Sequence, residues 1–163
     1  MRIAVLSDTH LVEPDAALLA VFRRYLEPAD LVFHLGDAVG EPVWAMLNAH
    51  AHFVAVAGNC DHPVLQAALP RLRRVEAGGL VFGMAHGWGP RSQVGVTVAA
   101  QFPDAAIVLY GHTHKRHWER LPDGRWLLNP GSLFWPRDDA PGGLAILHLG
   151  AAAPQVEWVD VAT

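Results

Sequence analysis

Five short hydrophobic runs in this sequence each end in residues whose side chains can bind a metal ion. The candidate ligands that follow these runs are Asp8 and His10, Asp37, Asn59, His86, and the pair His112 and His114. If the runs are parallel or mixed β-strands, their carboxyl ends lie along one edge of a sheet, where α/β proteins place their binding sites. The sequence therefore predicts an α/β fold that gathers Asp, Asn and His side chains around metal.

The order of strand and helix patterns supports this class of fold. The expected strands cover residues 2–6, 30–35, 53–57, 80–85 and 105–110, and the expected helices cover residues 14–28, 42–49, 63–69 and 92–102. The first three strands and their helices predict two right-handed βαβ units. Turn signals then predict two hairpins, one pairing residues 118–120 with 126–128 and one pairing residues 144–149 with 156–161.

Length and composition limit the kinds of protein that this chain can be. Its 163 residues fit a single domain over residues 1–163, and a charged fraction of only 17% opposes disorder. A net charge of -4 provides no basic field for a nucleic-acid polymer, so we expect a small partner molecule. No apolar stretch approaches membrane-spanning length, and the single cysteine suits a reducing compartment. We expect a cytoplasmic protein without membrane contact, and homo-oligomerisation stays open.

The number of candidate ligands predicts more than one metal ion. Asp8 and His10 are two residues apart, so in an extended backbone both side chains point to the same face. The whole set provides three oxygen-donor and four imidazole side chains, which exceeds the need of one ordinary site. Two ions that share a ligand would use the full set, as they do in two-metal hydrolases.

The ordered set Asp8-x-His10, Gly36-Asp37, Gly58-Asn59, His86 and Gly111-His112-Thr113-His114 resembles the calcineurin-like metallophosphoesterase superfamily. The segments Asn129-Pro130-Gly131-Ser132 and Pro136-Arg137 are similar to those of its small single-domain phosphodiesterase branch. The resemblance implies a four-layer α-β-β-α sandwich of two mixed sheets. It also implies a divalent-metal-dependent phosphodiesterase that hydrolyses a small phosphodiester through a binuclear centre and a bridging hydroxide.

The resemblance also divides the ligands between two ions. It assigns Asp8, His10, Asp37 and His114 to the first ion, and Asp37, Asn59, His86 and His112 to the second. Asp37 would bridge them, and Asp37, Asn59, His86 and His112 would be the catalytic residues. The donors suit manganese, iron, zinc or nickel by type, and the resemblance favours manganese.

Three other functions stay open. Within the same superfamily the chain could be a phosphomonoesterase or a dinucleoside polyphosphate hydrolase, although a short chain has little room for extra specificity elements. It could also be a non-catalytic protein-binding scaffold, similar to the retromer subunit that shares the fold. Loss of a metal ligand would favour the scaffold, whereas all the expected positions are filled here.

Cys60 is the main departure from the family pattern, since many members have His after this Asn as a phosphate ligand or leaving-group acid. The small phosphodiesterase branch also carries Cys here. The thiol is therefore either a weak acid or a packed residue. Asp61 could support the site or cap a helix, and His62 could replace the missing acid or lie on a solvated loop.

Several other side chains have two interpretations from sequence alone. Trp88 could line a substrate entrance, although pinning its own loop is the more ordinary role. Asn129 and Ser132 could support the site or only stabilise a turn. The sequence also predicts that His34 is a hydrogen-bonded residue within a strand, and that Arg71, Arg73 and Arg74 form a solvated turn.

Overall fold

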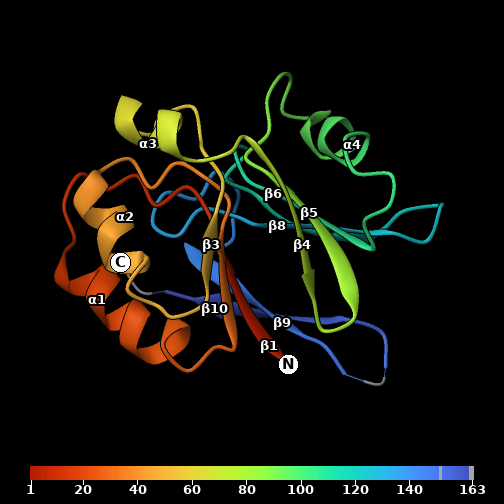
Figure 1. Cartoon of the computed structure of the whole chain (residues 1–163), viewed down its shortest axis with the longest axis horizontal. Helices are drawn as coiled ribbons and strands as arrows, with labels where there is room; N and C mark the ends of the chain where they lie inside the picture. Colours follow the sequence, from red (N-terminus) through yellow and green to blue (C-terminus); the bar gives the residue numbers. More distant parts are fainter. Residues whose placement is uncertain (151, 162–163) are drawn as a thin grey trace.

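Two five-stranded mixed sheets lie face to face in the computed structural model, which describes residues 1–150 and 152–161 (Figure 1). In spatial order, the first sheet consists of β10 (Gln155–Asp160), β9 (Gly143–His148), β1 (Arg2–Leu6), β2 (Leu31–His34) and β3 (Phe53–Ala55). The second consists of β4 (Leu72–Ala77), β5 (Leu80–Ala85), β6 (Ile107–Tyr110), β8 (Trp126–Pro130) and β7 (Arg116–Arg120).

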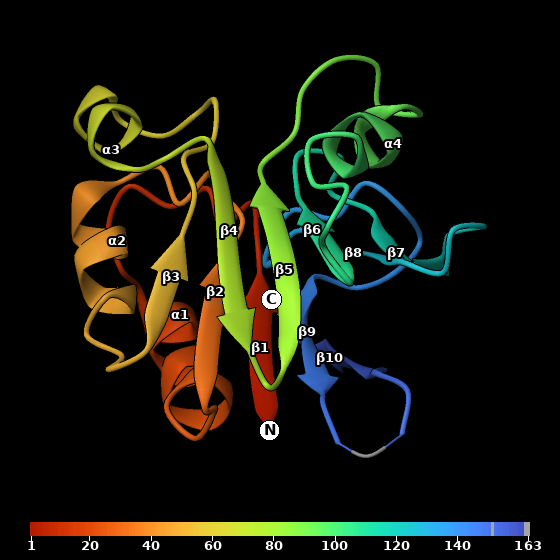
Figure 2. The ribbon, with the colours of Figure 1, turned by 45° about the vertical axis from the view of Figure 1, so that its right-hand side comes forward.

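Helices cover the outer faces of both sheets, so the molecule has the predicted four-layer α-β-β-α arrangement (Figure 2). The helical elements are α1 (Ala16–Val21), the π-helical turn η1 (Phe22–Leu26), α2 (Glu41–Leu47), α3 (Pro63–Ala68) and α4 (Val94–Ala99). Helices α1, η1 and α2 pack on the first sheet, and α4 packs on the second. No helix among the described residues is long and apolar enough to cross a membrane.

Strand β1 shows why its sequence is a continuous hydrophobic run. Ala4 and Leu6 pack into the core beneath α1 and α2, whereas Ile3 and Val5 face the second sheet, in a core that includes Phe82 of β5. These four of the five β1 residues have no exposed surface. A strand buried on both faces has no polar side to show, so it lacks the alternation of a surface strand.

The directions of the strands place the predicted ligands at one edge. In the first sheet β1 pairs in parallel with β2, and β2 with β3. In the second sheet β5 pairs in parallel with β6, and β6 with β8. Since parallel strands end at the same edge, the loops that follow β1, β2, β3, β5 and β6 meet there.

The hairpins were predicted correctly, and β4 was missed. Strands β7 and β8 pair antiparallel, as do β9 and β10. The expectation of a solvated turn at Arg73 and Arg74 was wrong, because both lie in β4, which pairs with β5 across the Gly78-Gly79 turn. Residues of β4 alternate between exposed and half-buried. This is the pattern of an edge strand, and its arginines concealed it.

Candidate metal centre

All seven predicted ligands lie in loops that follow the carboxyl ends of strands, at the place where the two sheets meet. The loop after β1 supplies Asp8 and His10, the loop after β2 Asp37, the loop after β3 Asn59, the loop after β5 His86, and the loop after β6 His112 and His114. Sequence positions 104 residues apart come into contact here, since His10 Nε2 lies 3.2 Å from His114 Nε2. The site is therefore built across the seam between the sheets.

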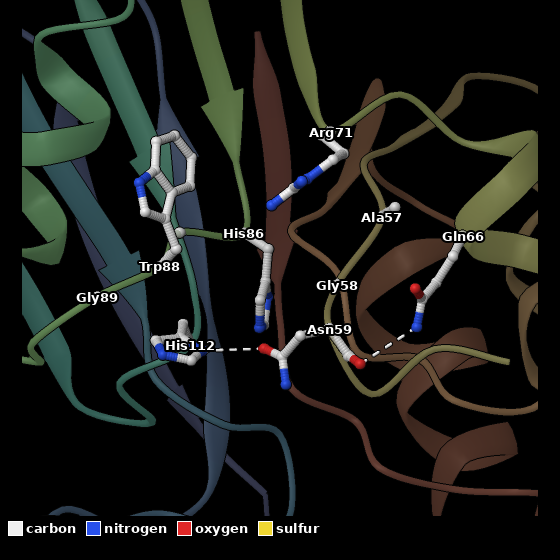
Figure 3. Close-up of a pocket in the computed structure, with 10 residues that line it drawn as sticks. Ala57, Gly58, Asn59, Gln66, Arg71, His86, Trp88, Gly89 and His112 are labelled. Carbon is white, nitrogen blue, oxygen red and sulfur yellow. Dashed lines mark hydrogen bonds between the residues drawn. The ribbon is translucent and has the colours of Figure 1, made fainter. Parts of the chain in front are cut away.

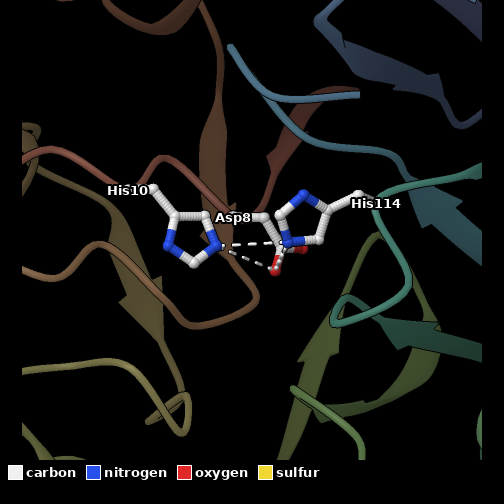
Figure 4. A group of neighbouring side chains, drawn as sticks. All are labelled: Asp8, His10 and His114. Carbon is white, nitrogen blue, oxygen red and sulfur yellow. Dashed lines mark hydrogen bonds and ion pairs between the residues drawn. The ribbon is translucent and has the colours of Figure 1, made fainter. Parts of the chain in front are cut away.

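Asp8, His10 and His114 form one group of facing ligand atoms (Figure 4). Asp8 Oδ1 lies 3.2 Å from His114 Nε2 and 3.7 Å from His10 Nε2. These three donor atoms all lie within 4.8 Å of one another, so they could bind a single ion together.

Asp37 and His86 form a second group beside the first. His86 Nε2 lies 3.2 Å from Asp37 Oδ2 and 3.9 Å from Asp8 Oδ1. Asp37 Oδ2 also lies 3.6 Å from His10 Nε2, which belongs to the first group. The Asp37 carboxylate is thus within reach of both groups, in the place that a bridging ligand would need.

Asn59 and His112 face each other at the rim of the second group (Figure 3). His112 Nδ1 lies 3.1 Å from Asn59 Oδ1. Burial, followed by the positive charge of His86, lowers the pKa of His112. A neutral imidazole is the form that can bind a metal ion.

Backbone carbonyl groups orient two of the imidazoles. His86 Nδ1 lies 2.7 Å from the Leu35 carbonyl oxygen, and His114 Nδ1 lies 2.7 Å from the Trp135 carbonyl oxygen. A carbonyl can only accept, so each ring carries its proton on Nδ1 and donates it. The Nε2 atoms are then turned toward the Asp37 and Asp8 carboxylates, which is the arrangement of metal-binding histidines.

The chemistry of these donors fits a divalent cation. Asp8 Oδ1 and His86 Nε2 are buried without a hydrogen-bond partner among the described residues. An imidazole lone pair facing a carboxylate is unfavourable unless a metal ion or a proton lies between them. Burial lowers the pKa of His86, but the Asp37 and Asp8 carboxylates outweigh burial and raise it. In the metal-free protein a proton on His86 would therefore offset part of the negative charge of the two carboxylates.

Five of the seven ligands have left-handed backbone conformations, which non-glycine residues adopt only rarely. The φ angles are 52° at Asp8, 51° at His10, 59° at Asp37, 68° at His112 and 60° at His114. Each such residue costs about 1–3 kcal/mol unless its surroundings hold it in place. Such strain gathers at functional sites, and here it turns side chains from five loop positions toward one centre.

Asp61 holds two of the ligand loops together. Its carboxylate accepts hydrogen bonds from the backbone N–H of Gly58 at 2.7 Å, Val39 at 2.8 Å and Asp37 at 3.2 Å. Its side chain does not cap α3, whose N-cap residue is His62. Of the two roles that the sequence left open, the geometry favours support of the site. A side chain at Gly58 would clash, since its Cβ would lie 2.0 Å from Asp37 Oδ1.

Cys60 and His62 lie near the site in different ways. The Cys60 N–H donates to Asp37 Oδ1 at 2.7 Å, and its sulfur lies close enough to Asp37 and His10 to join them around an ion. Burial, followed by the charge of Asp37, raises the pKa of the Cys60 thiol to about 11. The His62 imidazole is held 2.9 Å from Glu41 on α2, which does not favour a role as the acid.

Asn129 and Ser132 tie the last segment of the second sheet to the ligand loops. Asn129 Nδ2 donates to the Gly111 carbonyl and to Thr113 Oγ1, at 2.9 Å and 3.0 Å. Ser132 Oγ donates to the Asp8 carbonyl at 2.6 Å. Both residues therefore position ligand segments in addition to forming their own turn.

The structure also reveals supporting residues that the sequence did not identify as part of the site. His34, which was predicted to be a hydrogen-bonded residue within a strand, is buried. Its Nε2 lies 2.9 Å from Oγ1 of Thr9, the residue between the ligands Asp8 and His10. Gln66 on α3 donates to the Asn59 carbonyl at 3.2 Å. Neither residue belongs to a ligand motif, so the spacing of motifs alone could not find them.

Two cavities flank the ligands. A cavity of about 340 Å³, here called the metal-side cavity, is lined by Asn59, His86 and His112 together with Gln66, Arg71 and Trp88 (Figure 3). A second cavity of about 480 Å³ lies beside His10 and His114 and is also lined by Trp135 and Arg137. The ligand cluster therefore has space for bound groups on two sides.

Known proteins resemble this chain over nearly its whole length. Residues 1–152 match the family model of the calcineurin-like phosphoesterase superfamily domain. A probable metallophosphoesterase of Bacillus subtilis, YsnB, is 30% identical over 168 residues, which cover 99% of this chain and 92% of the relative.

Solved structures share the fold. A predicted phosphoesterase from Streptococcus pneumoniae superposes with a TM-score of 0.76 and 26% identity, covering 98% of this chain and 88% of the other. A single-substitution variant of Vps29 from Entamoeba histolytica superposes with a TM-score of 0.73 and 25% identity, covering 98% of this chain and 99% of the other. Together with the match over residues 1–152, these similarities show that the chain belongs to the calcineurin-like phosphoesterase superfamily.

Proposed function

We propose that this chain is a divalent-metal-dependent phosphodiesterase that hydrolyses a small phosphodiester at a centre of two transition-metal ions. The observation that carries the proposal is the position of Asp37, whose carboxylate lies 3.2 Å from His86 and 3.6 Å from His10. A carboxylate between two groups of imidazoles is what a pair of ions with one shared ligand requires.

The residues divide as the family resemblance implies. Asp8, His10, Asp37 and His114 would hold the first ion, and Asp37, Asn59, His86 and His112 the second. When bound, the two ions would supply an activated water and neutralise the charge that develops on the phosphoryl oxygens. Manganese is the expected metal, and iron, zinc and nickel suit the same donors.

The protein's own residues would hold this machinery in position before substrate binds. The Leu35 and Trp135 carbonyls fix the ring orientations of His86 and His114. Asn59 lines the metal-side cavity, where its side chain can contact a phosphate oxygen. Such pre-organisation reduces the rearrangement needed during reaction.

The two cavities favour a diester over a monoester. A phosphodiester carries two ester groups, and the cavities beside His112 and His114 offer one space to each. A phosphomonoesterase needs only one such space. A Vps29-like scaffold is the second candidate, on the observation that Vps29 shares this fold over 98% of the chain. A scaffold would not require the orphaned Asp8 and His86 atoms.

Hydrolysis of bis(p-nitrophenyl) phosphate tests the proposal. Metal-stripped protein should be inactive, and manganese should restore turnover with two ions bound per chain. Asp37→Asn should lower turnover by several orders of magnitude, because both ions would lose their shared ligand. Asp15→Asn is the matched control, since Asp15 only caps α1 and Asn caps equally well.

Full activity under continued chelation would contradict the proposal. A protein that binds one ion per chain and turns over normally as Asp37→Asn would contradict the two-ion part alone. A folded, metal-binding protein without any phosphoesterase activity would favour the scaffold.

A further inference from the structure

Arg71 points into the metal-side cavity from the wall opposite the histidines (Figure 3). The guanidinium groups of the two nearby arginines have protein partners. Arg73 donates to the Ala55 carbonyl, and Arg74 forms an ion pair with Asp104 at 2.8 Å. Within residues 1–150 and 152–161, no hydrogen bond or ion pair engages the Arg71 guanidinium. It presents donor groups to the cavity that no protein carboxylate satisfies.

Arg71 brings a permanent positive charge to the lining of this cavity. It is the only Arg or Lys among the described residues that line the cavity, and no Asp or Glu lines it. A guanidinium presents a planar fork of donors, which matches a phosphate or carboxylate group in two-pronged contact. The unoccupied donors of Arg71 therefore suit an anionic ligand.

Trp88 lies across the cavity from Arg71, in the loop that follows β5 (Figure 3). Its side chain is 36% exposed, which does not favour the expected role of pinning the loop. Arg71 and Trp88 also line a third cavity of about 390 Å³, here called the outer cavity, together with Leu72 and Gln101. The two residues therefore lie where a substituent of the reacting phosphate would extend away from the metal centre.

From this geometry we infer that Arg71 and Trp88 form a specificity site for a phosphodiester with a nucleotide-like arm. The arm carries a planar ring, which stacks on Trp88, and a second anionic group, which binds Arg71. The inference rests on the proposed phosphodiesterase function and names its class of substrate. The reaction is unchanged, because water adds to the phosphorus of the diester and the alcohol departs, while the second anionic group does not react.

The location of Arg71 distinguishes this role from a clamp on the reacting phosphate. Three candidate ligands of the second ion, Asn59, His86 and His112, lie across the metal-side cavity from Arg71 (Figure 3). Arg71 lies at the junction with the outer cavity, where Leu72 and Gln101 replace the metal ligands. A cavity of about 340 Å³ is at the lower end of the roughly 300–1,000 Å³ range for small-molecule sites. It fits one small arm and does not suit a polymer.

A matched pair of substrates tests the inference. We would compare the p-nitrophenyl ester of thymidine 5′-monophosphate with the same compound bearing a 3′-phosphate, since the two differ only in the second anionic group. In the manganese-loaded wild type, the 3′-phosphate should raise kcat/KM about tenfold, the effect of one charge-assisted hydrogen-bonded contact. Arg71→Ala should bring the ratio of the two kcat/KM values close to one, and Arg71→Lys should retain part of it.

Arg74→Ala is the matched control, because Arg74 lies on the neighbouring strand and lines neither cavity. It should keep the wild-type ratio. Equilibrium binding of thymidine 3′,5′-bisphosphate, measured by calorimetry, should weaken about tenfold in Arg71→Ala. Trp88→Ala should weaken binding of both the bisphosphate and thymidine 5′-monophosphate, whereas Trp88→Phe should restore part of it.

A wild-type ratio of one, or an unchanged ratio in Arg71→Ala, would overturn the inference. An equal loss for both substrates leaves the ratio unchanged, and would place Arg71 on the reacting phosphate instead. Turnover of the compound without the 3′-phosphate reports the phosphodiesterase proposal separately. Failure of the inference is thereby distinguished from failure of the proposed function.

Discussion

Replacement of Asp61 should show how strongly one buried carboxylate supports the metal centre. Asp61→Ala removes the acceptor from the N–H groups of Gly58 and Val39, which now make short contacts of 2.7 Å and 2.8 Å. Hydrogen bonds to a charged group contribute about 1.5–3 kcal/mol each, so the loss should be about 3–6 kcal/mol. A small domain has a total stability of about 5–15 kcal/mol, so this variant approaches the limit of folding.

Asp61→Asn gives a milder test. An amide oxygen in place of Oδ2 can still accept from Gly58 and Asp37, but the amide NH₂ then faces the Val39 N–H. One bond to a charged acceptor is lost, so we expect destabilisation of about 2 kcal/mol. Because the same N–H groups position Asp37 and the Asn59 loop, metal affinity should fall by about 10- to 100-fold.

Urea unfolding of the protein in the presence of a chelator would measure the free energy of unfolding. Calorimetric titration with manganese would measure the metal affinity. Asp15→Asn is again the control, with both quantities expected at wild-type values. If Asp61→Asn binds manganese as tightly as wild type and unfolds at the same urea concentration, Asp61 does not support the ligand loops in the way described.

Three further predictions concern single side chains. Metal affinity should fall as the pH falls, with proton release on binding, because the metal must displace a proton from His86, whose pKa is raised; pH-independent calorimetry would contradict this. Gly58→Ala should weaken metal binding at least tenfold while the chain stays folded, since its Cβ would lie 2.0 Å from Asp37 Oδ1. Cys60→Ser should keep most turnover of nitrophenyl diesters, and rates should fall steeply for alkyl leaving groups; collapse of Cys60→Ser at unchanged metal content would make the thiol the acid.

Local patterns in the sequence predicted much of this fold. The run at residues 2–6 was predicted to be a strand because it is short, aliphatic and followed by polar residues, and the structure confirms the range. Strand β4 was not predicted, because Arg73 and Arg74 are typical of a solvated segment and their pairing with β5 is visible only in the structure. Whether a half-polar strand forms depends on the neighbour that accepts its hydrogen bonds, and that neighbour is fixed only by tertiary structure.

The candidate site shows the same division. Because Asp8, Asp37 and His86 each follow a predicted strand, the sequence predicted that they would meet. In the structure His86 Nε2 lies 3.9 Å from Asp8 Oδ1 and 3.2 Å from Asp37 Oδ2. The sequence could not show that the Leu35 and Trp135 carbonyls orient the imidazoles, because a backbone carbonyl has no signature in a sequence. The sequence likewise could not show that Arg71 lines a cavity with His86 and His112, because the walls of this cavity come from distant segments.

The position of the ligands across the seam has a mechanical consequence. Asp8 and Asp37 follow strands of the first sheet, whereas His86 and His114 follow strands of the second. An ion bound among them would act as a cross-link between two layers that otherwise adhere chiefly through apolar packing. Separation of the layers would then require the ion to leave first. Metal release would set how fast the sandwich opens, and the loaded protein should resist unfolding far longer than its equilibrium stability alone suggests.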